Sequence, residues 1–225
     1  RIEETFQDIR CKGYEKAIAI NFSGGLSGTA NMVRLLGEQC VGLEVAAFDT
    51  LSGSLGTGMT VLQAARWLEE GRGFVEVCHA IPRIMHTTTV FFCIDTLEYL
   101  QKGGRIGLIT SFAGTLLNIK PIISFAPSGE LVNVAKVRGR KLAIQKMVAM
   151  AADLVPEGAA FNIAVAHGDS PAEFKEIRAL AKQSMPGYKS LFEGEIDGTL
   201  GVYTGPHLLG VGVQLLPDGL FPTSV

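Results

Sequence analysis

The chain has 225 residues, of which 47% are hydrophobic and 19% charged, and its formal net charge is −2. This length suits one large domain or two small ones, and the composition is that of a globular protein with a sizeable core. The small negative charge argues against a nucleic-acid-binding surface, which usually needs a clustered basic face. The apolar runs are too short to span a membrane.

The four cysteines are Cys11, Cys40, Cys78 and Cys93. Their wide spacing does not match that of metal ligands, so we expect free thiols in a reducing cytoplasm and no metal site. We expect no signal peptide. It begins at Arg1, inside a predicted helix, and we therefore expect an N-terminal portion to be missing.

The first third of the chain alternates between predicted strands and helices. Apolar runs predict strands at Lys16–Asn21 and Val45–Phe48, and helices follow them at Thr29–Gln39 and Gly58–Glu70. Strand, polar turn and helix in this repeated order indicate a parallel, Rossmann-like sheet. Ligands of such sheets bind at the carboxyl ends of the strands, where glycine-rich and serine-rich loops lie in this sequence.

The rest of the chain has a different pattern. A strand is predicted at Thr87–Ile94, a short helix at Gly114–Ile119, and then a pair of strands joined by a glycine turn. Closing strands are expected at Gly194–Ile196 and Leu209–Leu216. Adjacent strands mixed with helices indicate an α+β arrangement.

These patterns together predict an α/β protein with two domains. Residues 1–83 would form the parallel βαβ domain, truncated at its start, and residues 84–225 the α+β domain.

The turn Asn21–Thr29 is the segment richest in candidate ligand groups. It follows a buried strand and opens a helix, so backbone N–H groups, small hydroxyls and a helix N-terminus converge there and suit a phosphate or a carboxylate. The turn lacks the lysine of a P-loop, and it matches neither the dinucleotide-binding glycine pattern nor the serine-hydrolase elbow. A tight turn without a ligand is the alternative interpretation.

Three other places carry polar groups that could serve a site. Arg105 lies among glycines, where it could clamp an anion or simply be solvated. Arg138 and Arg140 belong to a basic cluster at a strand-to-helix junction, which is either a docking patch or a solvated surface. His167 lies next to Asp169 and Ser170, either of which could cap a helix, and this explanation is favoured over a functional histidine.

Taken together, these motifs resemble the DegV family. The segments that carry the resemblance, in family order, are Ser23–Thr29, Asp49–Thr50, Asp95–Leu100, Lys102–Gly107, Leu117–Ile122, Lys136–Lys141, His167–Asp169 and Gly201–Pro206. The resemblance implies a two-domain fatty-acid-binding protein that holds the acyl chain in an apolar tunnel. In bacteria, such proteins carry the substrate for a separate fatty acid kinase subunit, so we expect a cytoplasmic carrier that is not itself an enzyme.

The resemblance also implies a carboxylate-binding set. Ser23, Gly24 and Ser27 correspond to the turn that binds the carboxylate, and Arg105 to the glycine-flanked arginine near the ligand head. Gly24 replaces a second serine of the family pattern, and Tyr203 stands where the family commonly has a histidine. Family members also have an upstream threonine-serine-glutamine loop, which this sequence does not include.

The expected ligand and partners follow from the same resemblance. A bound palmitate, stearate or oleate is expected, without any cofactor. A kinase subunit is expected to dock near Arg138 and Arg140, and transient contact with a membrane surface is expected as well.

The alternative function is a phosphotransferase or hydrolase that acts on a small anion at the same turn. The residues expected to line the acyl tunnel are Phe112, Leu116, Leu117 and Ile119.

Overall fold

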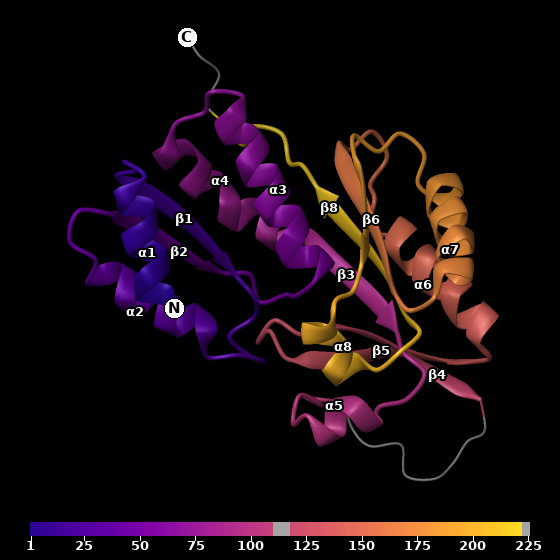
Figure 1. Cartoon of the computed structure of the whole chain (residues 1–225). Helices are drawn as coiled ribbons and strands as arrows, with labels where there is room; N and C mark the ends of the chain where they lie inside the picture. Colours follow the sequence, from indigo (N-terminus) through magenta and orange to yellow (C-terminus); the bar gives the residue numbers. More distant parts are fainter. Residues whose placement is uncertain (110–117, 222–225) are drawn as a thin grey trace.

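The computed structural model describes residues 1–109 and 118–221, which form two β-sheets with helices on both sides of each (Figure 1). No helix in these ranges is both long enough and apolar enough to cross a bilayer. The helices and strands, in chain order, are α1 (Ile2–Cys11), β1 (Lys16–Asn21), α2 (Thr29–Glu38), β2 (Glu44–Asp49), α3 (Leu55–Glu69), α4 (Phe74–His86), β3 (Thr88–Cys93), α5 (Glu98–Lys102), β4 (Ile119–Phe125), β5 (Leu131–Arg138), α6 (Arg140–Ala152), β6 (Phe161–Gly168), α7 (Pro171–Ser184), β7 (Leu191–Glu195), α8 (Gly198–Thr204) and β8 (Leu208–Leu215).

The first sheet consists of β1 and β2, which are parallel as predicted. Side chains alternate between its two faces, because successive residues of a strand point in opposite directions. Ala17 and Ala19 pack with α1 and α2, whereas Ile18, Ile20 and Phe48 pack with α3 and α4. Both faces are therefore covered, as is usual for parallel strands.

The second sheet has six strands in the order β5-β4-β3-β8-β6-β7. Only β6 and β7 pair in parallel; the other neighbours are antiparallel. Helices α6 and α7 cover one face around Met147, Ile163 and Ile177, which are fully buried. Helices α3 and α4 contact both this sheet and the first one, so they form the layer between the two sheets (Figure 1).

The mixed α/β fold class is confirmed, and the differences from the predicted elements are local. The predicted helix at Gly114–Ile119 is wrong at its end, because Ile119 begins β4; residues 114–117 lie outside the described ranges. Helix α8 was not predicted. The domain boundary at residue 83/84 stays a prediction, and it falls inside α4.

Candidate functional site

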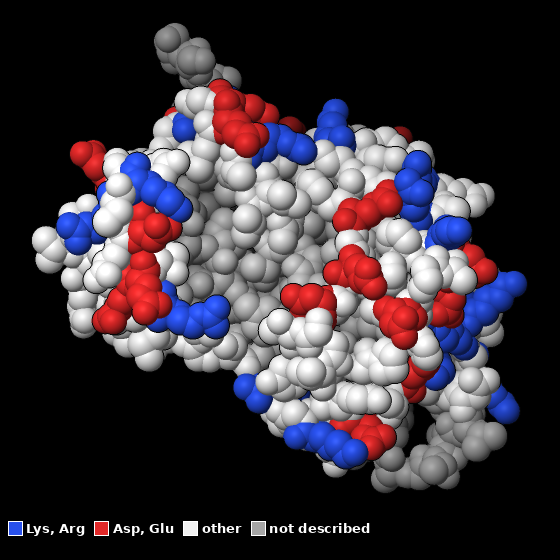
Figure 2. Space-filling view, in the orientation of Figure 1, with Lys and Arg blue, Asp and Glu red and all other residues white. Residues whose placement is uncertain are grey.

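An apolar pocket of about 730 Å³ lies between α3, the six-stranded sheet and α8. Figure 2 shows the hollow in the middle of this face as a largely uncharged surface with acidic side chains along one side. The volume falls within the range of about 300–1,000 Å³ that is typical of small-molecule sites. The pocket is thus the strongest candidate for a binding site among the described residues.

The walls of the pocket are mainly aliphatic and aromatic. Residues spaced by one helical turn on α3, such as Leu55, Met59 and Leu62, face it from one side, and the stretch 90–92 of β3 lines it from the other. The rings of Phe92 and Phe125, which both line the pocket, have centroids 6.4 Å apart. Such a surface suits a hydrocarbon chain and gives little to bind a polar ligand along its length.

Arg105 and Tyr203 form the polar end of the pocket. The guanidinium carbon of Arg105 lies 5.0 Å from the centroid of the Tyr203 ring, within the range of a cation–π contact. Arg105 Nε donates to the Leu26 carbonyl at 3.3 Å and Nη1 to the Gly103 carbonyl at 2.8 Å. These bonds place the guanidinium beside the glycine turn, and Nη2 takes part in neither of them.

Gly103 makes room for Tyr203. A Cβ atom on Gly103 would lie 2.8 Å from Tyr203 Cε1, which is closer than real Cβ contacts allow. The glycine after α5 therefore lets the tyrosine of α8 pack against it. Gly103 thus both caps the end of α5 and lets Tyr203 approach the polar end.

Ser27 also lines the pocket, at the start of α2. Its hydroxyl lies 2.9 Å from the hydroxyl of Thr29. Three of the five predicted carboxylate-binding residues, Ser27, Arg105 and Tyr203, are thus brought together by the glycine turn, α5 and α8. Their role as ligands stays a prediction.

The other two predicted ligands, Ser23 and Gly24, use their donors within the protein. Ser23 is fully buried, and its hydroxyl donates a 2.6 Å hydrogen bond to the Gly129 carbonyl in the β4–β5 hairpin. The Gly24 N–H donates to both carboxylate oxygens of Asp49 at 3.0 Å. Neither residue lines the pocket. In this geometry they hold the turn against its neighbours, and binding a carboxylate would require these bonds to open.

The charges that line the pocket are asymmetric. Arg105 is the only lysine or arginine among the described lining residues, whereas Glu193, Glu195 and Asp197 lie together on the side of β7. Glu193 pairs with Arg178 on α7 at 2.8 Å, and Asp197 caps α8 by accepting hydrogen bonds from two of its N–H groups. A ligand with one negative charge is therefore attracted toward Arg105 and repelled from the β7 side.

The predicted tunnel residues do not account for this lining. Phe112, Leu116 and Leu117 lie outside the described residues, and Ile119 is half-buried at the start of β4 without lining the pocket. The described walls come from α3, from strands of the six-stranded sheet and from α8. The helical spacing of apolar residues on α3 was the signal in the sequence, but it does not say which face of the helix adjoins a cavity.

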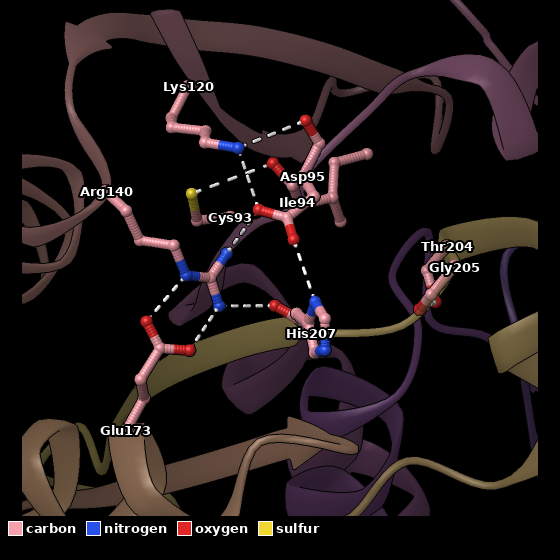
Figure 3. Close-up of polar contacts among 9 residues, drawn as sticks. All are labelled: Cys93, Ile94, Asp95, Lys120, Arg140, Glu173, Thr204, Gly205 and His207. Atoms are coloured by element: carbon pink, nitrogen blue, oxygen red, sulfur yellow. Dashed lines mark hydrogen bonds and ion pairs between the residues drawn. The ribbon is translucent and has the colours of Figure 1, made fainter. Parts of the chain in front are cut away.

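Of the predicted docking pair, Arg140 lies in a network of charged side chains (Figure 3). Its Nε and Nη2 atoms donate to the two carboxylate oxygens of Glu173 at 2.7 and 2.8 Å, and Nη1 donates to Asp95 at 3.1 Å. Nη2 also donates to the backbone carbonyl of His207. Arg138 is exposed on β5. Arg140 is thus held by groups within the protein, whereas Arg138 is accessible from solvent.

The network joins segments that are distant in sequence. Asp95, at the end of β3, also accepts a hydrogen bond from Lys120 at 2.8 Å and lies 2.9 Å from His207 Nδ1 (Figure 3). Burial alone would raise the pKa of Asp95, but the hydrogen bonds from Lys120 and His207 and the charge of Arg140 outweigh it and lower this pKa. Because His207 follows α8, the network fixes the turn that carries α8 to the pocket.

The histidine at the end of β6 has a structural role. The Nδ1 atom of His167 accepts a hydrogen bond from the Ser170 N–H at 3.2 Å, and its ring packs 4.8 Å from that of Phe174. It therefore binds a free N–H group at the start of α7, whereas the side chain of Ser170, the N-cap residue, makes no capping hydrogen bond. Among residues 1–109 and 118–221, no three His, Cys, Asp or Glu side chains are grouped to hold a metal ion.

Comparison with known proteins gives consistent matches along the chain. A family model described as an uncharacterised protein of the DegV family matches residues 1–215. A DegV domain-containing protein of Clostridium perfringens is 33% identical over 216 residues, which are 95% of this chain and 75% of the relative.

Two solved structures extend the match to the fold. A fatty-acid-binding DegV family protein of Thermus thermophilus has a TM-score of 0.83 and 28% identity, over 96% of this chain and 76% of its own. A DegV family protein of Ruminococcus gnavus, determined with vaccenic acid, has a TM-score of 0.83 and 28% identity, over 94% of this chain and 76% of its own.

Proposed function

The chain belongs to the DegV family, and from this premise we propose that it binds one long-chain fatty acid in the pocket between α3 and the six-stranded sheet. The observation that carries the proposal is the composition of the pocket: a large apolar volume with one lining cation, Arg105, among the described residues. A molecule with one carboxylate and a long hydrocarbon chain complements both parts. Fatty-acid binding by the relatives from Thermus thermophilus and Ruminococcus gnavus supports it.

We place the carboxylate at the end formed by Ser27, Arg105 and Tyr203. An arginine can donate two parallel hydrogen bonds to a carboxylate, and the hydroxyls of a serine and a tyrosine can supply further donors. The acidic side of the pocket, with Glu195, would repel the carboxylate in the opposite orientation. One lining cation suits a single carboxylate better than a polyphosphate.

We further propose that the chain presents the carboxylate to a separate kinase subunit, which forms the acyl phosphate. Arg138 is the better candidate for contact with that subunit, because it is exposed while Arg140 is held by Glu173 and Asp95. An exposed arginine is free to pair with an acidic group of a partner.

Two experiments test these steps separately. Calorimetric titration of the delipidated chain with palmitate and with oleate measures binding, and the proposal expects saturable binding of one molecule per chain. Absence of binding to both acids overturns it. The second experiment adds a bacterial fatty acid kinase catalytic subunit and ATP to the loaded chain; formation of acyl phosphate supports the carrier role, and its absence with a kinase active on another carrier contradicts it for that kinase.

A further inference from the structure

Two glycines leave unfilled space on different walls of the pocket. Gly58 lies on α3 and Gly194 on β7, and both line the pocket. A Cβ atom built on either glycine would meet no other atom of residues 1–109 and 118–221 within 4 Å. Neither glycine has a positive φ, so a larger residue could adopt the same backbone conformation. The missing side chains therefore widen the pocket rather than relieve backbone strain.

The strand pairing shows where the wall of the pocket carries its smallest side chains. Gly194 lies opposite Ala166, and Ala166 lies opposite Gly210, so three neighbouring strands contribute no more than one methyl group to this row. All three residues line the pocket. On β8, a Cβ on Gly210 would meet Leu55 at 3.4 Å, so the open space lies toward Gly194.

The next row of the sheet closes the space. Ala164 lies opposite Gly212, and a Cβ on Gly212 would lie 3.2 Å from the sulfur of Met59 on α3. Helix and sheet are therefore in close contact there. One row further, Asn162 donates to Gln63 at 3.0 Å and to Gln214 at 3.1 Å, and these buried amides join α3 to the sheet.

We propose that Gly58 and Gly194 set the width of the acyl-binding part of the pocket, and that this width selects a bent or branched acyl chain over a straight saturated one. Protein interiors are packed closely, and unfilled apolar space loses contacts on all of its walls. A chain with a cis double bond or a methyl branch occupies the extra width that a straight chain leaves empty. This inference rests on the proposed fatty-acid function.

The test replaces each glycine by a residue that fills the space. Gly58→Leu and Gly194→Val are chosen because leucine is favourable in a helix and valine in a strand, so both variants should fold at least as stably as the wild type. Gly58→Ala is a smaller change at the same position. The control is Gly201→Leu. Gly201 lies on α8 and does not line the pocket, and a Cβ built on it would meet no atom of the described part of the chain within 4 Å.

The dissociation constants of palmitate, palmitoleate and a methyl-branched acid of 16 carbons are then measured for the full 225-residue chain. We expect Gly58→Leu and Gly194→Val to weaken palmitoleate and the branched acid on the order of tenfold, with a clearly smaller effect on palmitate. The dissociation constants of Gly58→Ala should lie between those of the wild type and of Gly58→Leu, and those of Gly201→Leu should match the wild type. Whichever of palmitoleate and the branched acid the wild type binds more tightly shows whether the wide part of the pocket suits a bent or a branched chain.

The outcomes separate this inference from the function on which it rests. If the wild type binds these acids but the two pocket variants bind palmitoleate and the branched acid unchanged, or lose all three acids equally, the width inference is wrong and the proposed function stands. If the wild type binds none of the acids, both are overturned. Melting temperatures of the ligand-free variants show that any loss of affinity belongs to a folded chain.

Discussion

The hydroxyl of Ser23 donates a 2.6 Å hydrogen bond to the carbonyl of Gly129, which is 106 residues away in the chain. This bond joins the glycine turn after β1 to the hairpin between β4 and β5. The backbone of Gly25 also lies close to this hairpin, because a Cβ on Gly25 would be 2.7 Å from the Gly129 carbonyl carbon. The turn that resembles an anion site thus also connects the N-terminal segment to the six-stranded sheet.

Ser23→Ala should reduce stability. Removal of the hydroxyl leaves the Gly129 carbonyl without this donor in a buried place, which costs about 1–3 kcal/mol in the free energy of unfolding. Urea unfolding measures the change, and Ser27→Ala, at a half-buried position, should change stability by less than about 0.5 kcal/mol. If Ser23→Ala instead weakens fatty-acid binding without loss of stability, Ser23 is a carboxylate ligand and the structural role is wrong.

Arg105→Ala should weaken fatty-acid binding. Loss of the charged donor removes a hydrogen bond of about 1.5 kcal/mol, which corresponds to roughly tenfold in the dissociation constant, and the effect should shrink at high salt because Arg105 is exposed. Tyr203→Phe keeps the ring under the guanidinium but removes the hydroxyl, so it should weaken binding less. Equal affinities of wild type and Arg105→Ala for oleate would place the carboxylate elsewhere.

Arg140→Ala should affect stability, and Arg138→Ala should affect the reaction with a kinase subunit. Arg140→Ala breaks the bonds to Glu173, Asp95 and the His207 carbonyl, and we expect a loss of about 1–3 kcal/mol in unfolding free energy. Arg138→Ala should leave stability within about 0.5 kcal/mol but slow acyl-phosphate formation with a kinase subunit. A stable Arg140→Ala variant would contradict the structural role assigned to the network.

The same network should make stability fall at acid pH. The hydrogen bond from Arg140 is the main cause that lowers the pKa of Glu173, and the pKa of Asp95 is also lowered on balance. Because both pKa values are depressed on folding, this stabilisation is fully present above the ordinary values of 3.8 and 4.5 and is lost as the pH falls through the lower folded values.

We therefore expect the wild type to lose stability more steeply below pH 4.5 than Asp95→Asn or Glu173→Gln. Unfolding free energies measured across this pH range check the slope. Parallel curves of unfolding free energy against pH for the wild type and both variants would show that these two carboxyl groups do not cause the loss of stability at acid pH.

Local sequence patterns were sufficient to predict the parallel N-terminal strands. Each element there can be recognised from residues close to it in the sequence: the apolar run at Lys16–Asn21, the glycine turn that ends it and the helix that follows. Helix α8 was missed because Gly198–Thr204 is short and contains two glycines, which are poor helix formers. Asp197 followed by Gly198 and Thr199 was the usable signal, since the aspartate caps the helix.

Long-range contacts account for the rest. The partners of Arg140 are Glu173 and Asp95, which are 33 and 45 residues away, so the basic cluster alone did not show that this arginine is held in place. Likewise, the residues next to Ser23 in the sequence do not indicate that its hydroxyl donates a hydrogen bond to the Gly129 carbonyl. Ser27, Arg105 and Tyr203 were predicted from family motifs, whereas the apolar wall on α3 depends on how the helix packs on the sheet.

Native mass spectrometry of the delipidated chain mixed with oleate shows directly whether the chain holds a fatty acid. We predict a complex of one oleate per chain, with less complex for Arg105→Ala at the same concentration. A spectrum with only the free chain would contradict the claim that the pocket between α3 and the six-stranded sheet is a fatty-acid site.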